Sequence, residues 1–236
     1  MANCESPPSA SQQTVQPEQL NPHALDSAQD PSERFEVMQP PPPSSTDASS
    51  TTTPFDPYQD RPISTNSYAT RGYVHKNGIW HCSVHIWIVD PSSSTVLLQK
   101  RSMTKDTFPG RLDISSAGHV EAGTSLAKTA QLELAEELGV DDVEESELKL
   151  AFVIPAEGSP LGGCNAYEHV YFLTRSEDSQ FALGTAEVSE VCWKSAKELV
   201  HALRIKDEGY ATRTSQYVDF MEKELVKILG DEILGD

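Results

Sequence analysis

The stretch from Ser125 to Leu138 has the clearest pattern of hydrophobic and polar positions in the chain. It is rich in Ala, Leu, Lys, Gln and Glu, which favour helices, and Gly139 follows where a helix C-cap is expected. Glu133, Glu136 and Glu137 stand at i, i+3 and i+4, so their carboxylates share an arc of roughly 100° on one face. The neighbouring face is apolar and predicts contact with a core through Ala127, Ala130, Leu134 and Leu138.

Short apolar runs before and after this helix predict the strands of a β-sheet. Residues 81–89 are rich in apolar and β-branched side chains, and turn residues at 90–94 separate them from a returning strand at 95–99. This order predicts an α/β protein, with a mixed sheet between helices. The other predicted strands are residues 112–115, 148–154, 169–174 and 190–193, and the other predicted helices are 195–203 and 213–229.

Residues 1–68 differ in composition from the rest of the chain. They are rich in Pro, Ser, Thr and Gln, and they include four consecutive prolines at 40–43. Such a segment buries too little apolar area to offset the entropy lost on ordering. We therefore expect a disordered tail that is dispensable for chemistry, followed by a folded domain over residues 69–236.

The charge of the chain narrows the classes of partner. Its 236 residues carry a formal net charge of −18, and an acidic chain repels nucleic acids and anionic membranes. No apolar run approaches the roughly 18 residues of a membrane helix, and the first residues lack the features of a secretory signal. Scattered cysteines are expected as reduced thiols, which favours a cytoplasmic location without excluding the nucleus. They are Cys4, Cys82, Cys164 and Cys192.

The three clustered carboxylates allow two interpretations. Anionic groups this close repel one another, and they stay ionised together only when cations neutralise them or when one takes a proton. Carboxylate oxygens suit hard divalent cations such as Mg²⁺ or Mn²⁺. A solvated acidic face is the commoner meaning of such a run, and spacing alone leaves both interpretations open.

The residues around the carboxylates favour the metal site. The stretch from Gly118 to Val140 resembles the Nudix box, G-x5-E-x7-R-E-U-x-E-E-x-G-U, where U is a bulky apolar residue. The resemblance implies a Nudix fold, an α/β/α sandwich with a mixed sheet. It also implies that Glu133, Glu136 and Glu137, with Gly118, hold Mg²⁺ or Mn²⁺ against the diphosphate of a substrate. The matching positions are Gly118, Glu133, Leu134, Glu136, Glu137, Gly139 and Val140.

Two residues depart from the box. Thr124 stands in place of its first Glu, and Leu132 stands in place of its Arg. Losing both partners together leaves no orphaned charge, which would be the costly outcome. Because Leu132 lies about 140° around the helix from the apolar face, we expect it to pack on another element or to be exposed.

A wider stretch resembles the Nudix branch of isopentenyl diphosphate isomerases and their hydrolase-like relatives. His81 with Trp87, the run 97–119 and the run 187–193 carry the resemblance. The isomerases place a proton-transferring Cys directly before the Gly-His of this run, where this chain has Ala117. A methyl group transfers no proton, so isomerase chemistry is expected to be absent. In the isomerases the residues matching His81 and His119 bind a second metal; here they are expected as substrate contacts or as structural groups.

The same resemblance proposes the remaining site residues. Arg101 and Lys105 match basic positions that contact the substrate diphosphate, a role that suits both side chains. Glu168 matches an acidic position that completes the metal shell or acts as a base, and Glu187 is a second candidate. A solvated loop is the alternative for all four residues.

These observations favour a metal-dependent hydrolase of a diphosphate linkage in a small molecule. The substrate is left open between a nucleoside diphosphate derivative and an isoprenoid diphosphate. A non-catalytic Nudix module that binds a ligand or a protein partner is the alternative, because Thr124 and Leu132 depart from the box. The oligomeric state is also left open.

Overall fold

Strand β4 (His81–Asp90) lies at the centre of the sheet, and all ten of its residues are buried. It pairs antiparallel with β5 (Thr95–Arg101) and β7 (Ser116–His119), and parallel with β9 (Ala166–Thr174). Successive side chains of a strand point to opposite faces. Val84, Ile86 and Ile88 therefore join one hydrophobic core, whereas Trp87 and Val89 join another.

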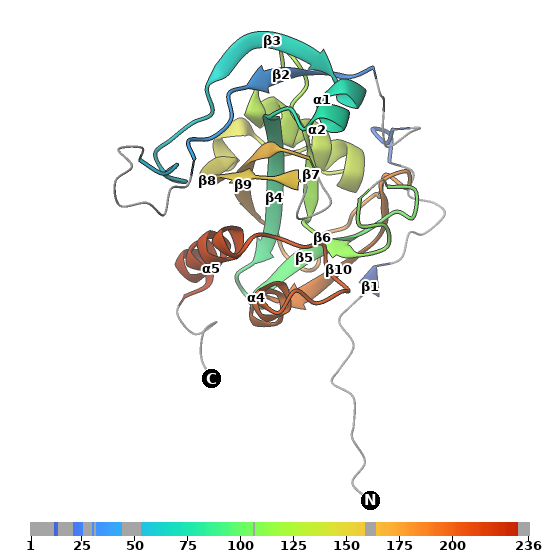
Figure 1. Cartoon of the computed structure of the whole chain (residues 1–236). Helices are drawn as coiled ribbons and strands as arrows, with labels where there is room; N and C mark the ends of the chain where they lie inside the picture. The colour runs from blue at the N-terminus through green and yellow to red at the C-terminus, as the bar shows by residue number, and fades with distance from the viewer. Residues whose placement is uncertain are drawn as a thin grey trace, which may run out of the picture.

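The computed structural model (Figure 1) describes residues 12–13, 21–25, 30, 32–43, 53–105, 107–158 and 164–230 of the chain. The main sheet follows the order β1–β10–β5–β4–β9–β8, with β6 paired to β5 and β7 paired to β4. One parallel pairing among antiparallel ones makes it the predicted mixed sheet. Its other strands are β1 (Gln12–Gln13), β6 (Leu112–Asp113), β8 (Lys149–Ala156) and β10 (Val188–Ser195).

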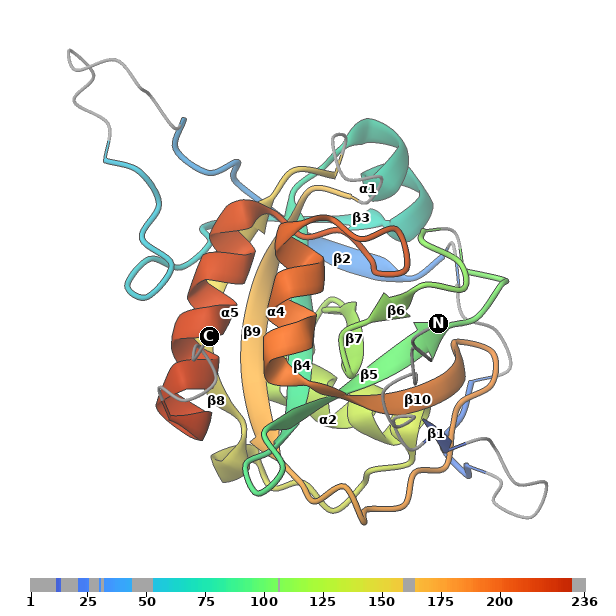
Figure 2. The same cartoon turned by 90° about the horizontal axis from the view of Figure 1, so that it is seen from below.

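Helices cover the sheet on both faces, as Figure 2 shows. Helix α2 (Leu126–Leu138) packs on one face, and helices α4 (Ala196–Arg204) and α5 (Ser215–Leu229) pack on the other. A short helix, α1 (Arg71–Asn77), precedes β4, and a 3-10 turn, η1 (Glu145–Glu147), precedes β8. The α/β/α sandwich is thus confirmed. Within the described ranges, no helix is long and apolar enough to cross a membrane.

Helix α2 begins and ends where the sequence predicts. The side chain of Ser125 accepts a hydrogen bond from the Lys128 backbone N–H, which caps the first turn. Gly139 ends the helix with a left-handed φ of 69°, a conformation that glycine adopts without strain. Of the predicted apolar face, Ala127 is half-buried, and the other three residues are fully buried: Ala130, Leu134 and Leu138.

The strand predicted at 112–115 is split into β6 and β7. Ser115 lies at the break, where its hydroxyl donates to the Leu97 carbonyl at 2.6 Å and accepts from the Ile88 amide at 2.8 Å. These two bonds occupy backbone groups of β5 and β4 at the point where the chain crosses between them. The Ser115 side chain thus replaces part of the backbone hydrogen bonding between strands. The alternation of apolar and polar residues in the sequence does not predict this break.

An ordered hairpin lies inside the segment that the sequence predicts to be a disordered tail. Strands β2 (Arg34–Met38) and β3 (Ser64–Thr70) pair antiparallel, and Phe35 is fully buried. The expected domain boundary at residue 69 therefore cuts through β3 and is wrong for this hairpin. Composition misses it because its two strands pair across a Pro- and Ser-rich connection. Much of the predicted tail, including residues 1–11, 14–20 and 44–52, lies outside the described residues.

Candidate active site

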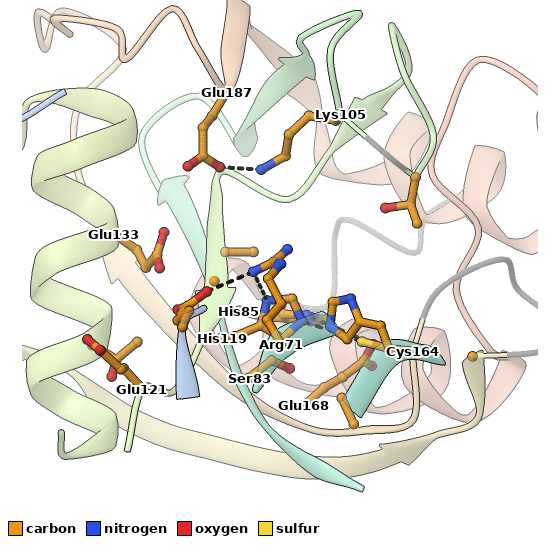
Figure 3. A pocket seen from close by; sticks show the side chains of 18 of the residues that line it. Arg71, Ser83, His85, Lys105, His119, Glu121, Glu133, Cys164, Glu168 and Glu187 are labelled. Atoms are coloured by element: carbon orange, nitrogen blue, oxygen red, sulfur yellow. Dashed lines mark hydrogen bonds and ion pairs between the residues drawn. The ribbon is translucent and has the colours of Figure 1, made fainter. Parts of the chain in front are cut away.

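A cavity of about 920 Å³ opens between α2, β9, the β5–β6 loop and the N-terminal hairpin. Figure 3 shows Glu133 projecting from α2 on one side, the Lys105 and Glu187 pair on another, and Glu168 beside Cys164 opposite. The cavity therefore brings together carboxylates and cations from distant parts of the sequence. Its charged lining residues include Arg71, Arg101, Lys105, Asp113, Glu133, Glu136, Glu168, Glu187 and Arg213.

Gly118 gives Glu133 its place in the cavity. Gly118 lies in β7 and pairs with Val84 of β4, so its backbone position is fixed by the sheet. A Cβ atom on Gly118 would lie 1.7 Å from Oε1 of Glu133, which no real contact permits. Glycine is therefore required at the first position of the box so that the α2 carboxylate can lie against β7.

The helix carboxylates share one electrostatic environment. Burial and the charges of Glu137, Glu187 and Glu136 hold the pKa of Glu133 well above its ordinary value. Burial and Glu187 also raise the pKa of Glu136, and they raise that of Glu137 to about 7 despite the nearby Lys105. Such mutual repulsion is relieved by a bound cation, and a set of carboxylate oxygens suits Mg²⁺ or Mn²⁺.

Glu137 differs from the other two helix carboxylates in its contacts. Its Oε2 accepts hydrogen bonds from the Ala117 amide at 3.0 Å and from Gln99 Nε2 at 3.1 Å. It is buried between α2 and strands β5 and β7, whereas Glu133 and Glu136 line the cavity. The structure therefore places two of the three predicted helix carboxylates in the open cavity, together with Gly118, and the third carboxylate beside it.

The two predicted phosphate contacts are both engaged by protein groups. Lys105 forms an ion pair with Glu187, and both side chains are nearly buried on the cavity wall. Arg101 donates from Nε to the Thr107 carbonyl at 2.8 Å and from Nη2 to the Thr107 hydroxyl at 3.1 Å. Its Nη1 also contacts Asp113 at 3.0 Å. Arg101 thus shapes the β5–β6 loop, and Lys105 neutralises a carboxylate near the α2 carboxylates.

Glu168 lies in the cavity, opposite Ser83 in the parallel pairing of β9 with β4. Its side chain is 15% exposed and lies 3.9 Å from Nε2 of His85. Burial raises the pKa of Glu168 to about 7, although Arg213 nearby acts to lower it. A carboxylate with a pKa near neutrality suits proton transfer at physiological pH.

The two predicted histidines belong to a chain of hydrogen bonds. Arg71 donates to Nδ1 of His119 at 3.3 Å, so His119 carries its proton on Nε2, which lies 3.4 Å from Sγ of Cys164. His81 donates from Nδ1 to the Ile79 carbonyl at 2.9 Å, so its Nε2 accepts from Cys164 at 3.5 Å. Burial lowers the pKa of both imidazoles and raises that of the thiol to about 11. Every member of this chain except Arg71 is therefore neutral.

The same group has the donor atoms of a metal site. One ligand atom from each of His75, His81, His119 and Cys164 lies within 4.8 Å of the others. Imidazole and thiolate ligands suit softer ions such as Zn²⁺ better than Mg²⁺. Because the Cys164 thiol holds its proton, metal binding here would have to release that proton.

Comparison with protein families decides the family. A family model described as the NUDIX domain matches residues 80–214, which are more than half of the chain. The protein belongs to the Nudix family. The match begins at the residue before β4 and ends at Thr214, the N-cap of α5, so it excludes the β2–β3 hairpin.

Similar proteins agree with this assignment. Nudix hydrolase 3 of Arabidopsis thaliana is 37% identical over 147 residues, which are 59% of this chain but only 19% of the plant protein. An uncharacterized Nudix hydrolase of Clostridium acetobutylicum is 32% identical over 146 residues, covering 59% of this chain and 69% of its own. The solved structure of DR0079 from Deinococcus radiodurans has the same fold, with a TM-score of 0.53 and 19% identity over 80% of this chain and 98% of that one. The predicted Nudix fold is thus confirmed, and the hydrolase names of the two relatives agree with the predicted hydrolase class.

The two departures from the Nudix box lie at the cavity. Leu132 is 40% exposed and lines the cavity together with Thr124. The exposure of Leu132 agrees with its predicted position away from the apolar face of α2. Neither residue is ionisable, so neither adds a charge to the lining of the cavity.

Sequence reasoning missed several residues that the fold brings to the cavity. Arg71 begins α1, and Arg213 precedes α5 and forms an ion pair with Asp113. Cys164 stands on the loop before β9, far in sequence from the histidines it contacts. A local signal was present only for Asp113, which falls inside the run 97–119 that resembles the isomerase branch. Long-range pairing decides the positions of the others.

Proposed function

We propose that this Nudix protein hydrolyses a diphosphate linkage in a small molecule and depends on Mg²⁺ or Mn²⁺. The observation that carries the proposal is the convergence of Glu133, Glu136 and Glu187 with the separate carboxylate of Glu168 on one cavity. The pKa values of Glu133, Glu136 and Glu168 are raised, and such carboxylates in one cavity suit metal binding and proton transfer.

The residues of the cavity divide the chemistry between them. Glu133, Glu136 and Glu137, with the Gly118 carbonyl, would hold the cation, which when bound neutralises phosphate charge and lowers the pKa of water. Glu168, or one of the helix carboxylates, accepts the proton of the attacking water. The water oxygen bonds to phosphorus as the bridging phosphorus–oxygen bond breaks, and the products are two phosphate species. Lys105 leaves its ion pair with Glu187 and contacts a phosphate oxygen of the substrate instead, which stabilises the bound diphosphate.

A place in the isomerase-like branch, without isomerase activity, is part of this proposal. Ala117 lines the cavity, and its methyl group neither donates nor accepts a proton. The neutral hydrogen-bond chain through His81, Cys164 and His119 supports a structural role for the two histidines. Free thiols at Cys82, Cys164 and Cys192 agree with a reducing, cytoplasmic location.

A non-catalytic Nudix module is the competing proposal. It rests on Thr124 and Leu132, which replace two charged residues of the box beside the cavity. A binding module would take up a diphosphate ligand without releasing products. Binding with no turnover under any metal condition would therefore favour the module over the enzyme.

The deciding experiment separates the reaction products by chromatography for a panel of nucleoside diphosphate derivatives and isoprenoid diphosphates, with Mg²⁺, with Mn²⁺ and with EDTA. The expected result is metal-dependent hydrolysis that Glu133→Gln and Glu168→Gln each reduce on the order of 100-fold or more. Glu208→Gln is the matched control, because Glu208 is exposed and does not line the cavity. Equal rates in EDTA and in Mg²⁺, or equal rates for all three variants, would contradict the proposal.

A further inference from the structure

Phe108 stands in the loop between β5 and β6 and lines the cavity that contains Glu133 and Glu168. Of the described residues around that cavity, Phe108 alone is a phenylalanine, tyrosine or tryptophan. Its side chain is half-buried, so part of the ring is accessible from the cavity. The Phe108 ring is therefore a large hydrocarbon ring at a cavity whose lining includes many charged and polar side chains.

The backbone of Phe108 has a conformation that bulky residues rarely adopt. Its φ is +50°, in the left-handed region where a Cβ atom crowds the following carbonyl. A bulky residue persists there only when its surroundings hold it, and such residues cluster at ligand sites. The chain thus places an aromatic ring where glycine or asparagine would fit the backbone more easily.

Arg101 and its neighbours hold this loop from both sides. Arg101 donates to the carbonyl and to the hydroxyl of Thr107, directly before Phe108. The Gly110 amide donates to the Arg101 carbonyl at 3.1 Å, and the Arg111 amide donates to the Phe108 carbonyl at 3.2 Å. The backbone on both sides of Phe108 is consequently held by hydrogen bonds.

A guanidinium group covers part of the Phe108 ring. The Cζ atom of Arg111 lies 5.4 Å from the ring centroid, within the range of a cation–π contact. Since Arg111 is not among the residues lining the cavity, the cation supports the ring from outside it. This leaves the cavity side of the ring for a ligand.

We propose that Phe108 is the platform on which the nucleobase of a nucleoside diphosphate derivative stacks, which sets the substrate class of the site. The inference rests on the proposed hydrolase function and deepens it. A base is flat, apolar on its faces and polar at its edges, so it matches one aromatic surface among polar groups. A cavity of about 920 Å³ has room for a nucleoside diphosphate derivative.

An isoprenoid tail matches the cavity less well. A prenyl chain gains its binding free energy by burying apolar surface on all sides. The large apolar side chains lining the cavity in the described part of the chain are only Leu25, Phe108 and Leu132. The other lining residues are charged, polar or small, and burying apolar carbon against unpaired polar groups is unfavourable.

Three variants separate stacking from damage to the loop. Phe108→Ala removes the ring and keeps a side chain at the strained φ. Phe108→Gly removes the ring and relieves the strain, so its melting temperature is expected to equal or exceed that of Phe108→Ala. Phe108→Trp keeps an aromatic surface and serves as the conservative variant.

The assay measures kcat and KM for ADP, CDP, GDP and UDP, for dimethylallyl diphosphate and for inorganic pyrophosphate. Phe108→Ala and Phe108→Gly are expected to raise KM for the nucleotides that the protein hydrolyses on the order of tenfold or more. Neither should change KM for pyrophosphate, and Phe108→Trp should stay within about threefold of the native protein. Unchanged nucleotide KM values, or an equal rise for dimethylallyl diphosphate and pyrophosphate, would overturn the inference.

Calorimetric titration with ADP and Mg²⁺ distinguishes this inference from the proposed function. If the native protein hydrolyses nothing but binds ADP, and Phe108→Ala loses that binding while Phe108→Trp retains it, the hydrolase proposal fails and the stacking platform stands. If the native protein hydrolyses only isoprenoid diphosphates, the hydrolase proposal stands and the platform fails. Absence of both hydrolysis and ADP binding overturns both.

Discussion

Phe35 stacks on His81, with ring centroids 5.0 Å apart and ring planes 7° from parallel. Phe35 also stacks on His119, with centroids 5.1 Å apart and ring planes 19° from parallel. Phe35 belongs to the N-terminal hairpin, whereas the two histidines belong to the central sheet. The hairpin therefore packs against the central sheet beside the cavity, which its Arg34 lines, although the family match begins only at residue 80.

Phe35→Ala is expected to lower the free energy of unfolding by about 3–5 kcal/mol, because it removes a fully buried ring and leaves a cavity beside His81 and His119. Denaturant titration measures the change. Tyr68→Ala in the paired strand is the control, since Tyr68 is 50% exposed and should cost far less. A chain beginning at Ala69 should be destabilised at least as much as Phe35→Ala; equal stability of that chain and the full-length protein would show that the hairpin is not part of the folded unit.

Gly118→Ala is expected to reduce kcat on the order of 100-fold, because its methyl group must displace the Glu133 carboxylate. Steady-state kinetics with the best substrate of the panel would measure this. Gly209→Ala is the matched control, since its methyl group would lie 3.1 Å from a single side-chain oxygen of Asp207 at the surface. Full activity in Gly118→Ala would mean that Glu133 does not need its position against β7.

Excess Mg²⁺ or Mn²⁺ is expected to raise the melting temperature, because a ligand that binds only the native state stabilises it. Glu137→Gln should remove most of this rise by replacing one of the three helix carboxylates. Differential scanning fluorimetry in EDTA and in metal provides the comparison, with Glu208→Gln as the control at an exposed position. Identical melting curves in EDTA and in excess metal would rule out metal binding at α2.

The stability of the metal-free protein should depend on pH through Glu168. Its folded-state pKa is raised from 4.5 to about 7, so the folded state binds this proton more tightly than the unfolded state. The resulting stabilisation is complete below about pH 4.5 and is lost as the pH rises through about 7. The free energy of unfolding of the native protein relative to Glu168→Gln should therefore fall between pH 5 and pH 8. A constant difference would show that Glu168 titrates normally.

Isopentenyl diphosphate is expected to give no dimethylallyl diphosphate, because Ala117 supplies no proton. Slow hydrolysis of the same substrate is compatible with the proposed chemistry, which needs only metal, water and a diphosphate. Chromatographic analysis of the products separates the two outcomes. An isomer peak above that of a reaction without protein would show that another group transfers the proton.

Local signals explain why α2 could be predicted almost to the residue. Its cap, its apolar face and its terminal glycine all lie within one stretch, from Ser125 to Gly139. The hairpin of β2 and β3 could not be predicted in this way, since its strands find each other across a long connection of low apolar content. Secondary-structure propensity describes short stretches of sequence, whereas the pairing of strands that are far apart in the sequence depends on the whole fold.

In the candidate site, too, the residues of a local motif could be predicted, whereas those placed by long-range contacts could not. Glu133, Glu136 and Gly118 came from one continuous motif and do meet at the cavity. The engagement of Arg101 by Thr107 and Asp113 was not foreseeable, because it depends on the path of a loop. Arg213 and Cys164 belong to no sequence motif that would have predicted a role for them. Only the fold brings Arg213 near Glu168 and Cys164 near the histidines.

The parallel pairing of β4 with β9 bears on the order in which the protein folds. Helix α2 forms hydrogen bonds only between residues close in sequence. Glu168, by contrast, reaches its place only when β9 pairs with β4, which lies much earlier in the sequence. Pairing two parallel strands requires a long loop to close, and the entropy cost of closing it comes before any stabilising contact forms. Such pairs form slowly for that reason. The acidic helix can thus be complete while the carboxylate across the cavity is still unplaced, and assembly of the active site waits on a long-range pairing of the sheet.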